Sequence, residues 1–310
     1  MSDAPIPGAA RGAALPPPVA ETNRPLAAAG FMVLALLNFS AMAVAGREAQ
    51  AELDTFELLM WRSLAGLVIV LVVLRISGGL ATLRFRRLGL HTARNVVHFA
   101  GQNLWFHAVT LIPLAQLFAY EFTSPLWVAL LAPLLLGERF VRTRLLAAGL
   151  GFVGILIVAR PWSAGADFGE GQVAALGAAV FFAATVLSTK SLARTESAAS
   201  ILVLMTGMQF LFGLATAGWD LEIAVPDATL GWVAAVAVTG LAAHWSATMA
   251  LSLAPASVVA PMEFARLPMI AVVGWLVYAE ALEAAVLIGA AVVFAGNLIN
   301  LRAERRRAAA

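Results

Sequence analysis

Ten apolar runs constrain this chain more than any other feature of its sequence. They lie at about 26–45, 56–74, 90–109, 114–136, 145–159, 172–189, 199–217, 229–250, 256–279 and 284–301. Most are about 18–22 residues long, enough for a helix to cross roughly 30 Å of hydrocarbon. The chain is 61% hydrophobic and 12% charged, which is about half the charged share of a soluble domain. We therefore predict an all-helical polytopic membrane protein with ten transmembrane helices.

One stretch of the sequence occurs twice. Residues 108–157 align without a gap to residues 250–299, and the matching pairs include Leu111/Leu253, Pro113/Pro255, Glu121/Glu263, Phe122/Phe264, Glu138/Glu280, Phe152/Phe294 and Gly154/Gly296. Each half holds five predicted spans, so the second copy enters the membrane from the opposite side. Inverted halves are a recurring transporter design, with the substrate near the midplane between them. We predict two inverted five-helix repeats around a central cavity, working by alternating access.

The repeat and the composition divide the chain into five segments. Residues 1–25 are rich in alanine and proline without an apolar signal region, which predicts a disordered cytoplasmic tail. The first repeat is expected at 26–160 and the second at 172–301. A periplasmic linker at 161–171 joins the repeats, and a basic cytoplasmic tail follows at 302–310.

The distribution of charge orients the chain. Most of the 20 basic residues fall in alternate loops together with the two termini, while Arg47 and Arg160 fall in the other set of loops. Acidic residues such as Glu52, Asp54 and Asp167 show the reverse bias. Basic loops stay on the cytoplasmic side. Both termini are therefore expected in the cytoplasm.

Several function classes lack support in the sequence. There is no cysteine, which excludes disulfides and cysteine metal sites. No zinc-hydrolase motif, phosphate-binding glycine loop or nucleophile elbow occurs, and an intramembrane hydrolase using Glu121 with His98 would lack a nucleophile. We expect no enzyme activity, cofactor, metal or nucleic-acid partner. A passive channel would not need inverted halves kinked by proline, and a non-transporting membrane scaffold is the alternative from a different class.

The residues also carry a family resemblance. The proline-bearing fourth and ninth spans each end at an acid, and the tract from Ser124 to Arg139, ending Leu-Gly-Glu-Arg, resembles a segment of the drug/metabolite transporter superfamily. The second copy has Ala279 where the first has Gly137. Over roughly 26–301 the chain is most similar to the EamA group, which includes bacterial amino-acid and metabolite exporters of the YddG type. The resemblance implies a bacterial inner-membrane exporter.

A polar stripe on the third span is the first candidate for a substrate site. His98, Gln102 and Trp105 follow one another at helical spacing, so they share a face. Polar groups inside a span usually face a cavity or another helix. The stripe therefore either lines a cavity or joins helices by hydrogen bonds, and we favour the cavity for His98 and Gln102.

Two carboxylates form the second candidate. Glu121 and Glu263 lie about six residues into their spans, close to Pro125, Pro261 and Pro268, which we expect to act as hinges because proline interrupts helical hydrogen bonding. Either carboxylate can meet an ammonium group or carry a proton. The alternative for Glu263 is a buried ion pair with Arg266, three residues later.

The remaining candidates are weaker. Tyr120, His244 and Trp245 either line the cavity or pack between helices. Arg62 is expected to be structural and to pair with an acid.

These groups together predict a substrate. Glu121 suits an ammonium group, His98 or Gln102 a carboxylate, and Trp105 with Tyr120 a size-tolerant side chain. We predict a monomeric exporter of neutral and aromatic amino acids and related metabolites with broad specificity. Lipophilic drugs and a metabolite such as a nucleotide sugar are the alternatives.

Overall fold

The computed structural model describes residues 24–124, 126–128, 130–131, 142–159, 168–192, 195–219, 222–253, 262, 266–281 and 283–308. All regular elements within these ranges are helical. The α-helices are α1 (Pro25–Ala49), α2 (Thr55–Ile76), α3 (Leu88–Leu111), α4 (Leu114–Glu121), α6 (Arg142–Ala159), α7 (Glu170–Leu192), α8 (Ala198–Ala217), α9 (Leu230–Leu253), α11 (Arg266–Tyr278) and α12 (Ala284–Ala308), with a 3-10 turn η1 at Gly79–Thr82. The helical class is confirmed.

Length and composition identify the membrane-spanning helices. Among the described residues, five helices are long and apolar enough to cross a bilayer, in α1, α2, α7, α8 and α9. Shorter apolar segments lie in α11 and α12. The presence of ten transmembrane helices stays a prediction. Helix α12 also continues to Ala308, so residues 302–308, predicted as a tail, are helical.

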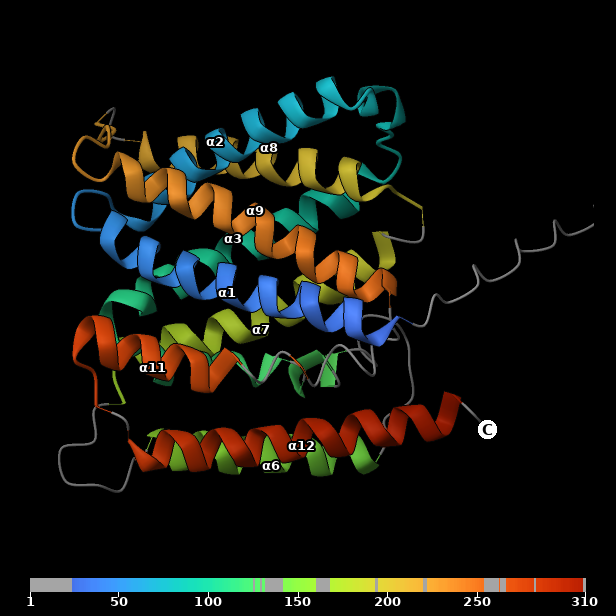
Figure 1. The fold of residues 1–310 in the computed structure, drawn as a ribbon, viewed down its shortest axis with the longest axis vertical. Helices are drawn as coiled ribbons and strands as arrows, with labels where there is room; N and C mark the ends of the chain where they lie inside the picture. Colours follow the sequence, from blue (N-terminus) through green and yellow to red (C-terminus); the bar gives the residue numbers. More distant parts are fainter. Residues whose placement is uncertain are drawn as a thin grey trace, which may run out of the picture.

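The helices lie side by side, and each long helix has one main partner. Helix α1 packs along α9, and α3 packs along α7. The pair α2–α8 forms one edge of the molecule and the pair α6–α12 the other, as Figure 1 shows. Helix α4 meets α11 between these layers. The start of α1 and the end of α12 lie on the same side (Figure 1), here called the N-terminal face; the other side is the opposite face.

Local sequence sets where individual helices begin and end. At the start of α2, the Asp54 carboxylate accepts from the Glu57 N–H at 2.8 Å, and Glu57 accepts from the Asp54 N–H at 3.0 Å. This reciprocal cap satisfies helix N–H groups that otherwise lack partners. Helix α4 ends at Glu121 and is followed by a turn at Phe122–Thr123. The fourth span is therefore interrupted just after Glu121, close to the proline at which the sequence predicts a kink. A proline four residues after Glu121 has no N–H to donate to the Glu121 carbonyl.

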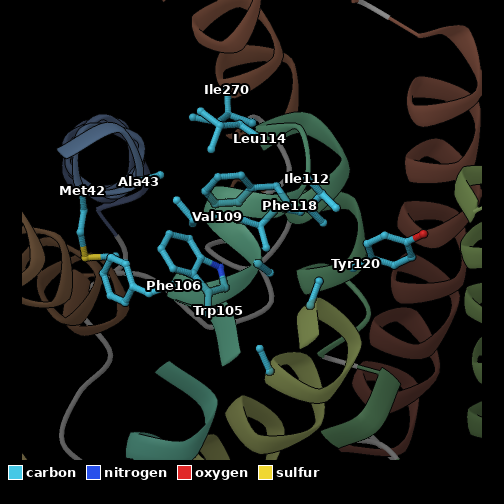
Figure 2. Packing of buried hydrophobic residues seen from close by; sticks show 14 of the residues in the cluster. Met42, Ala43, Trp105, Phe106, Val109, Ile112, Leu114, Phe118, Tyr120 and Ile270 are labelled. Carbon is cyan, nitrogen blue, oxygen red and sulfur yellow. The ribbon is translucent and has the colours of Figure 1, made fainter. Parts of the chain in front are cut away.

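The apolar core lies between the inner helices. Figure 2 shows Met42 and Ala43 of α1, Phe106 and Val109 of α3, Leu114 and Phe118 around α4, and Ile270 of α11 converging. The rings pack edge to face, with Trp105 and Phe118 centroids 5.9 Å apart, a favourable geometry for aromatic pairs. This packing fixes the position of α4 against α3 and α11.

Loop contacts hold the α2–α8 edge together on both faces. On the N-terminal face, the Glu196 carboxylate accepts from the N–H groups of Arg86 and Arg87. On the opposite face, the Glu52 carboxylate accepts from the Thr229 hydroxyl at 2.7 Å and from three N–H groups before α9. These hydrogen bonds hold the pKa of Glu52 below its usual value, and the bond from the Thr229 hydroxyl has the largest effect. They lower the pKa because they favour the charged carboxylate. This edge is therefore tied at both ends.

Candidate functional site

A buried arginine and two amides form the centre of the candidate site. Arg62 lies seven residues into α2, roughly 10 Å from its beginning, and is 9% exposed. With the Gln102 amide oriented to satisfy its neighbours, its oxygen accepts from Arg62 Nη1 at 3.1 Å and Nη2 at 2.9 Å, and its nitrogen donates to Gln209. A cation at the centre of a membrane helix costs about 2.5–3.5 kcal/mol on insertion scales. Such a residue is a candidate for function.

A small cavity adjoins this cluster. Its lining comes from α2, α8 and α9 and comprises Arg62, Ser63, Gly66, Met205, Thr206, Gln209, Ala237, Gly240, Leu241 and His244. The volume is about 20 Å³, enough for a water molecule or two. Ligand pockets hold roughly 300–1,000 Å³. The helices around this cavity have to separate before an organic solute can enter.

Two histidines and a second arginine lie around the same centre. His98 is buried with its ring against Phe182, and His244 packs edge-on against Phe39 at 5.3 Å. Arg94 donates to the Asn95 side-chain oxygen at 2.8 Å and to the Thr189 hydroxyl at 3.2 Å. No carboxylate among the described residues lies within ion-pair distance of Arg62 or Arg94. The centre of the described structure is therefore cationic.

A separate cluster surrounds Glu121. Its carboxylate accepts from Arg266 Nη2 at 2.7 Å and from the Trp105 indole N–H at 2.8 Å. The Arg266 guanidinium also lies over the rings of Phe39, Phe118 and Phe122, 4.6–5.3 Å from their centroids. Cation–π contacts of this kind stabilise a desolvated cation. Glu121 and Arg266 thus form a buried ion pair between the two halves of the chain.

A third cluster lies on the opposite face. Arg47, in the last turn of α1, donates to the Val109 carbonyl at 2.7 Å, the Ile112 carbonyl at 2.8 Å and the Glu280 carboxylate at 2.5 Å. Glu280 also accepts from the N–H of Leu114, the first residue of α4, at 2.9 Å. We call Arg47, Glu280 and these three main-chain partners the Arg47 latch. It joins the ends of α1, α3, α4 and α11 at one point.

The backbone before Glu280 is strained to build this latch. Ala279 has φ 52°, the only left-handed non-glycine residue in the described part of the chain, and this conformation costs an L-residue roughly 1–2 kcal/mol. The turn brings the Glu280 N–H to the Gly274 carbonyl at 3.1 Å. A side chain at Gly274 would collide with the Glu280 carboxylate. Both residues therefore aim Glu280 at Arg47.

The structure separates the residues that the sequence grouped into one site. His98, Gln102 and Trp105 are all at most 6% exposed, whereas Val96 on the same helix is 52% exposed, so the stripe faces inward. Gln102 contacts Arg62, but Trp105 belongs to the Glu121 cluster. His244 lines the cavity.

The other candidates lie outside both clusters or outside the described residues. Trp245 is 52% exposed beside Phe31, and Tyr120 is buried and points away from Trp105 and Phe118 (Figure 2). Pro268 is the third described residue of α11, a position where proline is compatible with a helix, and its role as a hinge stays a prediction. The predicted candidates Pro125, Pro261 and Glu263 lie outside the described residues.

Sequence reasoning missed the partners of three arginines. Arg62 was expected to pair with an acid but contacts an amide. Arg266 binds Glu121 in the other half, whereas Glu263, the partner that the sequence suggests, lies outside the described residues. The sequence places Arg47 in a loop, whereas the structure places it in the last turn of α1, where its guanidinium holds the ends of the inner helices together. For Arg62, the sequence did carry a signal, because an arginine inside an apolar span indicates a functional or buried polar partner.

The fold and these buried polar clusters define a helical membrane carrier, and the comparisons agree. The profile of the EamA-like transporter family matches residues 26–160 and 169–302. The chain belongs to this family, within the drug/metabolite transporter superfamily. It is a small-molecule transporter of a bacterial inner membrane.

Individual relatives differ in what they carry. A riboflavin transporter of Brucella anthropi is 32% identical, over 88% of this chain and 98% of the relative. An S-adenosylmethionine uptake transporter of Rickettsia felis is 23% identical, over 89% and 93%, and a pseudopaline exporter of Pseudomonas aeruginosa is 29% identical, over 52% and 55%. A solved crystal structure, 19% identical, covers 90% of this chain and 98% of its own with a TM-score of 0.62, which supports the fold.

Proposed function

We propose that this transporter carries riboflavin, or a similarly flat and acceptor-rich metabolite, by alternating access. The observation that carries the proposal is the Arg62–Gln102–Gln209 cluster beside a small cavity in the α2 region. Arginine and amide groups suit the carbonyl and ring-nitrogen acceptors of an isoalloxazine. Phe106, whose ring centroid lies 5.7 Å from the Arg62 guanidinium, offers a surface for stacking. The riboflavin transporter among the relatives supports the same substrate class.

Alternating access between inverted halves has support in the helix pairing. The two predicted repeats make α1, α2, α3, α4 and α6 the counterparts of α7, α8, α9, α11 and α12, in that order. When each helix is replaced by its counterpart, the pair α1–α9 becomes the pair α7–α3. The pairs α2–α8, α4–α11 and α6–α12 are converted into themselves. All five pairs occur. Inverted halves can therefore take turns as the gate on each face.

The orientation of the chain gives the first testable prediction. We expect both termini in the cytoplasm and the Arg47 latch on the periplasmic face, because the basic loops gather with the termini. A reporter fused after Ala310 should be active only as a cytoplasmic reporter, and one fused after Gly169 only as a periplasmic reporter. The reverse pattern would overturn this orientation.

Export of neutral and aromatic amino acids is the second candidate, favoured by one observation. Arg62 can bind a carboxylate in a bidentate manner. The ammonium group has less to bind, because Glu121 already contacts Arg266 and Trp105. The relatives include both an uptake transporter and an exporter, so either direction of transport is compatible with the family.

Transport by the purified protein tests the substrate. Proteoliposomes loaded with riboflavin should accumulate labelled riboflavin by counterflow at a rate at least ten times that of protein-free liposomes. Labelled phenylalanine and a labelled nucleotide sugar form parallel arms in the same vesicles. Counterflow of phenylalanine without any counterflow of riboflavin would replace the flavin proposal by the amino-acid candidate.

A further inference from the structure

The hydrogen bonds of Arg62 carry a further inference, which rests on the proposed function. Its two terminal nitrogens both donate to one acceptor, the Gln102 amide oxygen, at 2.9 and 3.1 Å. A guanidinium fork is built to bind two acceptors on one planar edge. In this structure the two terminal nitrogens of Arg62 therefore share a single neutral oxygen, which uses less than the full hydrogen-bonding capacity of the guanidinium.

Among the described residues, no carboxylate lies within ion-pair distance of Arg62 to use this capacity. Within the described part of the chain, the charged or titratable side chains around it are Arg94, His98 and His244, none of which is an acid. Gln102 is in turn held by Gln209, so the amide pair acts as a neutral support for the cation. A buried arginine without a carboxylate is costly for stability, and such costs are typical of functional sites.

We infer that Arg62 anchors the transported solute and selects solutes with two adjacent hydrogen-bond acceptors on one planar edge. The solute takes the place of the Gln102 oxygen on the guanidinium as the cavity opens. Two sources present this edge: a carboxylate, and the N1/O2 or N5/O4 edge of an isoalloxazine. Lipophilic cations lack it and are repelled by Arg62 and Arg94, which disfavours the drug alternative.

Binding to the purified full-length protein tests the inference with two sets of probes. The first set is riboflavin with its 1-deaza and 5-deaza analogues, each of which lacks one acceptor of one edge. The second is phenylalanine with phenylalaninamide, which lacks the carboxylate. We expect the complete member of one set to bind at least tenfold more tightly than an analogue in the same set. The set that shows the preference identifies the source of the edge.

Substitutions at Arg62 then separate binding from folding. Arg62→Lys keeps the charge without the fork, and Arg62→Gln removes the charge; each should weaken binding of the preferred probe at least tenfold. The melting temperature should stay equal or rise, since Arg62 has no carboxylate partner among the described residues. Arg75→Gln, an exposed position on the same helix, is the matched control and should bind as the wild type does.

Each other outcome has a defined meaning. Equal binding by wild type and Arg62→Lys would overturn the role of Arg62 while leaving the proposed transport intact. A large fall in melting temperature together with lost binding would make Arg62 a structural residue and also overturn the inference. No binding and no counterflow of any probe by the wild type would overturn the proposed substrate, and this inference with it.

Discussion

Replacing Arg47 with alanine is expected to open the opposite face of the transporter. Arg47 makes three directed hydrogen bonds, one of them to the Glu280 carboxylate, and both side chains are largely buried at 17% and 13% exposure. Hydrogen bonds to charged groups contribute about 1.5–3 kcal/mol each. Losing them should shift the ratio of closed to open forms at least tenfold, because about 1.4 kcal/mol corresponds to a factor of ten.

A single cysteine reports this opening, because the protein has none of its own. Thr206 lines the cavity and is 5% exposed, so Thr206→Cys should react slowly with a charged, membrane-impermeant thiol reagent applied to intact cells. Arg47→Ala should raise that rate about tenfold or more. Glu280→Gln should raise it in the same direction, since the amide cannot neutralise Arg47.

The matched control for the latch is Arg75→Ala, an exposed arginine on the other face. It should leave labelling at Thr206→Cys unchanged. Arg47→Lys should give an intermediate rate, because an ammonium keeps the charge but not the planar fork. Unchanged labelling in folded Arg47→Ala and Glu280→Gln proteins would contradict the role of the latch.

The sequence predicted the protein class well because the signals for it are local. Apolar length identifies a membrane helix without knowledge of its neighbours. The inward face of α3 is a similar case, since His98, Gln102 and Trp105 share one side by helical geometry alone and all are buried.

Which residues come together in each cluster depends on how the helices pack against one another. The spacing of residues along a single helix does not carry this information. Trp105 is one turn from Gln102 but faces a different neighbour, so the stripe divides between two clusters. Arg266 pairs with Glu121 because α11 lies against α4. Arg47 binds two carbonyl groups, and main-chain acceptors carry no sequence signature.

Variants of the Glu121–Arg266 ion pair can distinguish a structural role of this pair from a role in transport. Arg266→Ala alone would leave the Glu121 carboxylate buried with the Trp105 indole as its remaining partner among the described residues. Breaking a buried ion pair by removing one member costs about 3–5 kcal/mol, so thermal unfolding of the purified variant should show a large loss of stability. Glu121→Ala should be similarly harmful, because it leaves the Arg266 cation among aromatic rings.

The double variant Glu121→Gln with Arg266→Met should recover most of the lost stability. It removes both charges together, a change that is often neutral for a buried pair, and the glutamine oxygen can still accept from Trp105. If the pair only joins the two halves, this variant should keep at least half of the wild-type rate of riboflavin counterflow. A stable double variant without transport would show that at least one of these two charges takes part in the cycle, as the predicted contact of Glu121 with an ammonium group or a proton requires. A double variant as unstable as Arg266→Ala would contradict the ion-pair account itself, because neither charge would then remain uncompensated.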